Sequence, residues 1–394
     1  MTGIKFFFNR YLLWIGFLFY LLFAFFIKNP LQDVHLFESA GFYLTQKIDI
    51  YFIDQTHGTY PFFPFLIFPY ALAHLVVLRF PILAFSFLIK LIFIPTIFAL
   101  GILIEKISLL QGITKKTALK RKILFCLNPV VFFTVVYHGQ ADVLLLFFYF
   151  LSFYLLLNDK GYLKIVSSGI SFGLSVLTKT WSIVFFPLFL LKIRSLKLLL
   201  LHLISASSSI FIICYIYTRF VNSSFRQVLN AVLGHPAVFG QHSGSPSFWG
   251  IAAVLNLTHQ ITKNSNIQVF TLHFSTLSTF ILAGVFLLLY LIIFFKKTNF
   301  LRASLILVLG FYVITPSWGT QYTFWILPFL FLENIVYGFA YSLIATPYLF
   351  LSYLSAITPG EIYMNLSRIF SLFPWIFSLA VFCQLIKNVI QNKK

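Results

Sequence analysis

Long apolar runs fill most of this chain, and short clusters of basic residues separate them. Hydrophobic residues make up 60% of its 394 residues, and charged residues only 9%. A water-soluble protein of this length could not bury so much apolar surface, whereas a run of about 20 apolar residues can cross a bilayer. Backbone polar groups in lipid must be satisfied within the protein, so the expected fold class is all-α, a polytopic transmembrane helical bundle.

The net charge of +19 is explained by a membrane rather than by nucleic acid. Basic clusters at 115–122, 192–197 and 296–302 fall between apolar runs, where the positive-inside rule places cytoplasmic loops. No stretch interleaves aromatic and basic residues as nucleic-acid-binding motifs do. We therefore expect the lipid bilayer as a partner, and no nucleic acid.

Placing every basic cluster on the cytoplasmic side gives a topology. The 61–78 run contains Pro61, Pro64 and Pro69, and each proline removes a helical donor, so we expect this run to lie at the outer leaflet. About 12 spans (range 10–13) then alternate correctly. They run near 11–27, 84–104, 122–137, 143–157, 164–178, 181–191, 198–216, 270–295, 303–316, 322–338, 341–358 and 367–386.

This topology predicts one multi-pass integral membrane domain over 1–394, with both termini in the cytoplasm. Two long external segments follow from it. The first loop, 28–83, should carry juxtamembrane helices, and the second covers 217–269. A prokaryotic chain of this kind would lie in the inner or plasma membrane, with its polar segments facing outward.

Carboxylates are concentrated behind the first apolar run. Four of the nine are Asp33, Glu38, Asp49 and Asp54. A charge near the bilayer core is costly and usually marks function. Asp33 follows Pro30 closely and should sit near a helix N-terminus, where a carboxylate stays ionised. It is the candidate general base, with a helix cap as the alternative, whereas Asp49 and Asp54 are expected to be solvated loop charges.

Further polar groups are expected on the same outer face. His138, Gln140 and Asp142 share a glycine-containing turn, Lys179 follows an apolar span, and Lys90 lies early in another. Two cations beside these groups favour an anionic, membrane-borne substrate, with Lys179 as a point charge for phosphate. The simpler alternatives are an interhelical loop and a lysine that snorkels to headgroups.

The remaining substrate-binding candidates come from two other places. His35 and Glu38 lie beside Asp33, and Gln321 and Tyr322 lie in a turn where an aromatic belt is the alternative. The small polar segment 240–250 could form a lid or a plain connector.

A divalent metal site is a further alternative. It would use Asp33, His35, His138 and Asp142, but no ligand spacing supports it, and no cofactor is predicted.

The order of these motifs resembles that of the GT-C superfamily of polytopic glycosyltransferases, closest to the mannosyltransferases of GPI-anchor assembly and their prokaryotic relatives. The series is Asp33, Tyr60-Pro61, Lys90, Asn128-Pro129, Gly139-Gln140-Ala141-Asp142, Lys179, and Gln321-Tyr322 with Trp325 and Pro328. The chain departs from the pattern at Phe62, where many relatives have a second proline. It also lacks an acid pair at Asp33, which argues against a metal-dependent variant.

The resemblance implies a GT-C-like bundle and a polyprenyl-phosphate-linked sugar as donor. The expected reaction moves a hexose, mannose by the resemblance, to a hydroxyl of a glycan, lipid or protein acceptor on the outer face. Asp33 would act as the general base of an inverting displacement. The alternative is a transporter or flippase for a lipid-linked or amphipathic anion, although we find no internal repeat typical of transporters.

Overall fold

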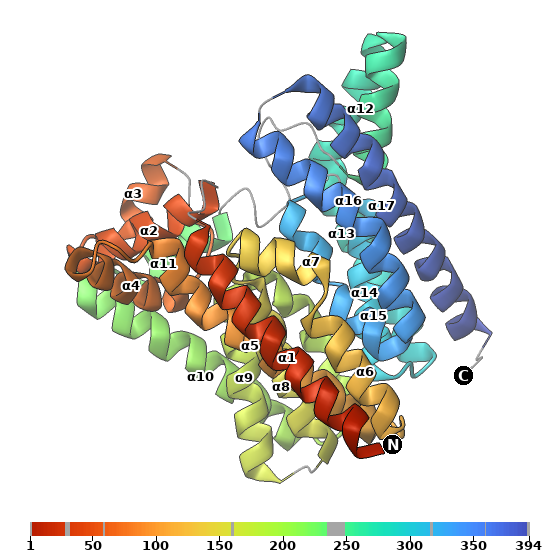
Figure 1. Ribbon diagram of the computed structural model, residues 1–394, viewed down its shortest axis with the longest axis horizontal. Helices are drawn as coiled ribbons and strands as arrows, with labels where there is room; N and C mark the ends of the chain where they lie inside the picture. The colour runs from red at the N-terminus through yellow and green to blue at the C-terminus, as the bar shows by residue number, and fades with distance from the viewer. Residues whose placement is uncertain are drawn as a thin grey trace. The chain divides into compact units, whose positions relative to one another are not determined.

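A computed structural model describes residues 2–27, 32–57, 60–158, 161–234, 249–315, 318–358 and 360–391. Every regular element within these ranges is helical, which confirms the all-α fold class. Contacts divide the chain into two units, Met1–Phe186 with Ile193–His235 and Pro187–Lys192 with Pro236–Lys394. Figure 1 labels the helices of both units.

The first unit is built from the N-terminal half of the chain. Its elements are α1 (Thr2–Phe26), α2 (Gln32–Thr45), α3 (Ile50–His57), η1 (Pro64–Leu66), α4 (Ile67–Arg79), α5 (Phe85–Leu110), α6 (Lys115–Cys126), α7 (Pro129–Val131), the π-helix η2 (Phe132–Tyr137), α8 (Asp142–Asn158), α9 (Tyr162–Thr178), the first half of the 3-10 helix η3 (Thr180–Leu191), α10 (Leu196–Val221) and α11 (Phe225–Gly234).

The second unit holds the C-terminal helices. They are α12 (Gly250–Thr262), α13 (Ser265–Phe295), α14 (Phe300–Ile314), η5 (Thr320–Phe324), α15 (Leu327–Glu333), α16 (Ile335–Ile357) and α17 (Glu361–Ile390). α16 and α17 pack against each other along their lengths, as Figure 1 shows in blue.

Among the described residues, five helices are long and apolar enough to cross a membrane. They are Phe85–Leu110, Leu196–Val221, Leu277–Phe295, Ile335–Ile357 and Glu361–Ile390. Six shorter apolar helices accompany them, at Tyr11–Phe26, Pro64–Arg79, Asp142–Leu157, Tyr162–Thr178, Thr180–Leu191 and Phe300–Ile314.

Two of the expected spans are not continuous helices. The 122–137 run divides into α6, α7 and η2, because Asn128 has an extended backbone and caps α7 through its side chain, with Pro129 at the first helical position. The 322–338 run is also divided. α15 ends at Glu333, because Asn334 is extended and its side chain caps the next helix, α16.

The expected long loop 217–269 is also largely helical where it is described. It contains the last turn of α10, all of α11 and α12, and the first residues of α13. Residues 235–248, including most of the expected lid segment, lie outside the described residues.

Two close helix pairs set the frame of the first unit. α2 packs on α4 at Gly41, where an added Cβ would stand 2.5 Å from the Tyr70 carbonyl oxygen. α8 and α9 are antiparallel neighbours: the Ser175 hydroxyl donates to the Leu145 carbonyl (3.0 Å), and the Ser152 and Ser168 hydroxyl oxygens lie 2.9 Å apart. The start of α8 therefore lies beside the end of α9.

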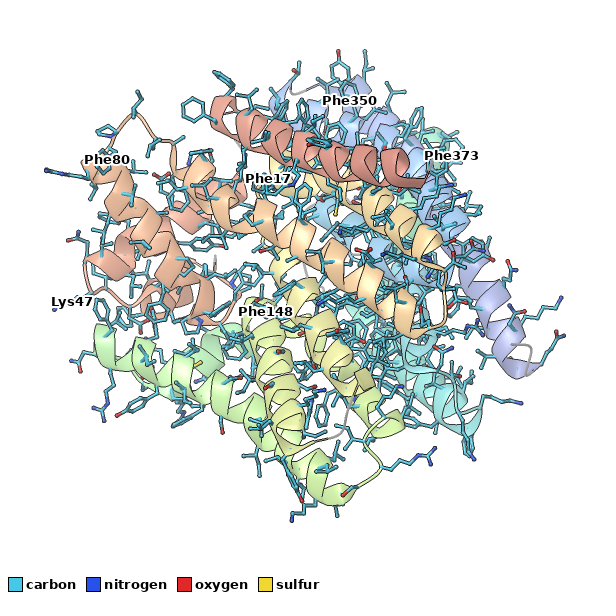
Figure 2. All side chains as sticks on the ribbon, turned by 60° about the horizontal axis from the view of Figure 1, so that its bottom comes forward. Phe17, Lys47, Phe80, Phe148, Phe350 and Phe373 are labelled. Carbon is cyan, nitrogen blue, oxygen red and sulfur yellow. The ribbon has the colours of Figure 1, made fainter. Side chains whose placement is uncertain are left out.

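The loop after α2 is held against α10. The Lys47 ammonium lies 5.9 Å from the centroid of the Phe220 ring, near the end of α10. Figure 2 shows Lys47 at this edge of the first unit. α3 also contacts α11, so the first loop is packed against helices that follow it by more than 150 residues.

Candidate active site

The turn between η2 and α8 has an unusual backbone. The His138 N–H donates to the Phe133 carbonyl (3.0 Å), five residues back, as in a π-helix. The N–H groups of Gly139 and Gln140 also donate back into η2, at 3.1 and 3.2 Å. This is a Schellman-type helix ending, widened by one residue because of the π spacing. Gly139 takes its left-handed position (φ 84°), which glycine adopts without strain.

Asp33 lies in the first turn of α2, as expected, and its carboxylate faces this turn. The side-chain amide of Gln140 donates to Asp33 Oδ2, and His138 Nε2 lies 3.3 Å from the same oxygen. His138 and Gln140 are buried, whereas 40% of the Asp33 side chain stays exposed. The side chain is thus held by protein on one side and partly exposed, and a general base needs such access to its substrate.

The contacts of His138 admit two protonation arrangements. Its Nε2 also lies 3.0 Å from Gln140 Nε2, which is a donor. A neutral His138 with its proton on Nδ1 accepts a hydrogen bond from Gln140 there. A protonated His138 instead donates to Asp33. In both arrangements Gln140 donates to Asp33, so the amide stabilises the carboxylate throughout.

The charge state of Asp33 follows from these partners. Burial by itself raises the pKa of Asp33, because it penalises the charged form. The hydrogen bond and positive charge of His138, the charge of Lys179 and the hydrogen bond from Gln140 outweigh this effect, so the pKa lies below its ordinary value. Asp33 is therefore ionised at neutral pH.

Lys179 and Asp142 form a buried ion pair beside this group. Lys179 Nζ lies 2.8 Å from Asp142 Oδ2, and the two side chains are only 7% and 1% exposed. Asp142 begins α8 and Lys179 directly follows α9, so the antiparallel pairing of these helices brings them together. This burial contradicts the simpler alternative, a lysine that snorkels to headgroups.

Lys90 is buried behind the same turn. Its ammonium donates to the Tyr137 carbonyl (3.2 Å), the last residue of η2, and the residue has no exposed surface. Lys90 therefore supports the backbone that carries His138 and Gln140. A direct contact between Lys90 and substrate stays a prediction.

His35 and Glu38 point elsewhere on α2. At about 100° per residue they lie roughly 160° and 140° around the helix axis from Asp33. His35 is exposed and Glu38 half-buried. The structure does not bring them to the partners of Asp33, and their role as substrate contacts stays a prediction.

Asp49 is not a solvated loop charge. Its carboxylate accepts hydrogen bonds from the Tyr217 hydroxyl (2.9 Å), the Tyr51 backbone N–H (3.1 Å) and the Ser223 hydroxyl. It immediately precedes α3, where a carboxylate satisfies the first N–H groups of a helix. Asp49 is half-buried because it lies at the start of α3 and is covered by Tyr217 and Ser223, which hydrogen-bond to it. The side chain of Asp54 lies outside the described residues.

Gln321 and Tyr322 belong to the second unit. Both are half-buried residues of η5. The Tyr322 ring lies 4.1 Å from that of Trp325 and 5.6 Å from that of Trp318, which stacks on Trp249 at 3.7 Å. An aromatic cluster therefore surrounds Tyr322, and Gln321 precedes it in η5.

The alternative metal site is not assembled. Within the described part of the chain, no group of three or more His, Cys, Asp or Glu residues lies close enough to hold a metal ion. Two of the four proposed ligands, Asp33 and His138, are neighbours, but Asp142 pairs with Lys179 and His35 faces away.

Comparison with known proteins identifies the family. Residues 52–316 match the model described as glycosyltransferase family 87, which is more than half of the chain. The chain belongs to glycosyltransferase family 87. The expected resemblance to GT-C-type membrane glycosyltransferases is confirmed at this level, and the apolar helices agree with an integral membrane protein. No curated protein matches the chain.

The family 87 match covers only part of the candidate site. The His138–Asp142 turn, Lys90 and Lys179 fall inside it, whereas Asp33 precedes it and Tyr322 follows it. Phe62, which the sequence did not single out as a site candidate, also lies beside this group: its ring centroid is 5.3 Å from Lys179 Nζ. Its position in the Tyr60-Pro61-Phe62 departure was the only signal.

Proposed function

We propose that this family 87 glycosyltransferase moves a hexose from a polyprenyl-phosphate donor to an acceptor hydroxyl on the extracytoplasmic face. Mannose is the proposed hexose, from the resemblance of the motif order. The observation that carries the proposal is the half-exposed Asp33 carboxylate, which accepts a hydrogen bond from Gln140 and faces His138. A base with one accessible side, next to buried cations, fits transfer from a phosphate-linked sugar.

In the proposed mechanism the acceptor oxygen attacks the anomeric carbon while the bond from that carbon to the phosphate oxygen breaks. The hydroxyl proton passes to Asp33, which is ionised and can therefore accept it. A single displacement inverts the anomeric configuration.

The leaving lipid phosphate gains one negative charge as the bond breaks. A fixed cation is most effective when it stabilises charge that develops only in the transition state. Lys179 supplies that cation, and Asp142 holds it in place. No strong general acid is needed, because phosphate is a good leaving group.

The Asp33→Asn variant tests the role of the base. It keeps the side-chain shape but cannot accept the proton, so transfer from polyprenyl-phosphate mannose in proteoliposomes should fall by about 10² to 10⁴. Glu105→Gln is the matched control, since Glu105 pairs with Lys122 near the end of α5. It should transfer sugar at the wild-type rate.

Retention of transfer by Asp33→Asn would remove the enzymatic role of this acid. If that variant and the wild type instead move the lipid-linked sugar across the bilayer without transferring it, the chain is a carrier of a lipid-linked anion.

A further inference from the structure

The ammonium of Lys179 has an aromatic partner as well as an acidic one. Phe62 lies on the segment between α3 and η1. Its ring centroid is 5.3 Å from Lys179 Nζ, within the range of a cation–π interaction. Phe62 is half-buried, and its ring meets that of Tyr60 edge to face at 5.6 Å. The ring is therefore fixed in orientation beside the cation.

A single hydroxyl holds the backbone of Phe62. The Tyr51 hydroxyl donates to the Phe62 carbonyl oxygen at 2.6 Å, and Tyr51 itself has no exposed surface. This bond ties α3 to the segment that carries the ring. Phe62 lies between Pro61 and Phe63, outside any helix, so helical backbone bonds do not set its position.

Asp49 in turn fixes Tyr51. It accepts the Tyr51 backbone N–H and the hydroxyl of Tyr217, whose ring lies 5.3 Å from that of Tyr51. The Tyr217 oxygen also accepts the Ile50 N–H at 3.1 Å. A continuous series of contacts thus runs from α10 through α3 to the cation of the site.

The Lys179 ammonium, held in this arrangement, can bind an anion. An ammonium has three N–H donors, and the contact with Asp142 Oδ2 uses one of them. The aromatic face excludes water from another side, which strengthens the electrostatic attraction of the ammonium for a phosphate oxygen. Removing the ring would let water solvate the ammonium and widen its range of positions.

We propose that Phe62 is a binding residue for the donor phosphate and that the Tyr51 hydroxyl is a positioning group for it. The Phe62 ring covers one side of the Lys179 ammonium, and the ammonium binds the phosphate of a lipid-linked sugar. This inference rests on the proposed function, because it takes the donor to be a polyprenyl phosphate.

Two substitutions test the proposal, with binding and kinetics measured separately. Phe62→Leu keeps an apolar side chain but removes the aromatic face, and Tyr51→Phe removes only the hydroxyl. The dissociation constant for polyprenyl phosphate in nanodiscs, and the KM for the sugar-linked donor, should rise about 3- to 10-fold in Phe62→Leu. Tyr51→Phe should shift both in the same direction by less, and kcat should fall in both variants, because the same ammonium stabilises the charge on the leaving phosphate.

Two further variants act as controls. Phe62→Trp keeps an aromatic face and should restore tight binding. Phe65→Leu makes the same change three residues away, at a half-buried ring that contacts Phe148 at 6.1 Å, and should leave both constants unchanged. If Phe62→Leu does not fold, Tyr51→Phe alone still gives the result.

Unchanged binding and KM in both test variants would overturn the proposal, as would a failure of Phe62→Trp to restore binding. If Asp33→Asn still abolishes transfer in that case, the proposed function stands without this inference. If the wild type does not bind polyprenyl phosphate at all, the donor class fails and the inference fails with it.

Discussion

Three aspartates of the first unit have different surroundings, and these surroundings separate their roles. Asp49 accepts hydrogen bonds from two hydroxyls and one backbone N–H, so it fixes structure. Asp142 is 1% exposed and neutralised by Lys179. Asp33 alone of the three combines a polar support with 40% exposure. Its position at a helix start indicated Asp33 as the candidate base from the sequence, and its partners and exposure support that choice over Asp49 and Asp142.

The pH dependence of transfer should report the partners of Asp33. Because its pKa lies below the ordinary value, wild-type kcat/KM should show no loss from Asp33 protonation between pH 7 and about pH 5. His138→Ala removes the hydrogen bond and charge that favour the carboxylate, so the pKa should rise and activity should be lost at higher pH than in the wild type. His138→Gln keeps a donor and should fall between the two.

The measurement is the acid limb of the kcat/KM profile for all three proteins. An acid limb at the same pH in wild type and both variants would assign the titration to a group other than Asp33.

At the level of the elements, the site depends on how η2 ends. Gly139 indicated a turn from the sequence alone, and the turn is present, with Gly139 in its left-handed position. The π spacing of η2 was not predictable, because it adds one residue per turn without any compositional signal. Its effect is concrete: it sets the register in which His138 and Gln140 reach Asp33.

Replacing Gly139 by alanine should separate strain from function. Gly139 has φ 84° and Gly112 has φ 80°, so alanine at either position carries a similar left-handed strain of about 1–2 kcal/mol. A Cβ at Gly112 meets nothing within 4 Å, and this residue lies beyond the end of α5, next to α6. Thermal unfolding in detergent should show destabilisation in both variants, and at least as much in Gly139→Ala, because Gly139 is buried and Gly112 is exposed.

Only Gly139→Ala should also lose transfer activity, because relief of its strain moves the turn that supports Asp33. Equal activity in Gly139→Ala and Gly112→Ala, after correction for folded protein, would show that the turn geometry does not matter for the reaction.

For the whole chain, the sequence predicted the helical fold class and the membrane family well, and the individual spans less well. Fold class follows from hydropathy, which every apolar residue contributes to. Breaks at Asn128 and Asn334 depend on single side chains that cap the next helix, so a hydropathy window passes over them. Long-range contacts such as Asp49 with Tyr217, or Phe62 with Lys179, leave no periodic pattern in one sequence.

The two ends of the helices in the first unit carry different charged groups, and this makes the orientation of the unit in the membrane testable. The ion pair of Asp142 with Lys179 lies where α8 begins and α9 ends, and the basic helix α6 follows the far end of α5. The positive-inside rule puts α6 in the cytoplasm, so the loop that carries Asp33 should face outward. Gln46 is an exposed residue of that loop, and Gln111 is an exposed residue beside α6. The two glutamines provide a matched pair of labelling positions.

Single cysteines at these two glutamines should therefore label from opposite sides. In a background with the exposed Cys383 changed to serine, Gln46→Cys should react with a membrane-impermeant maleimide in intact right-side-out vesicles. Gln111→Cys should react only after the membrane is permeabilised, and transfer activity should be retained in both. The reverse labelling pattern would place the Asp33 carboxylate on the cytoplasmic side, and the lipid-linked donor would then have to be used there.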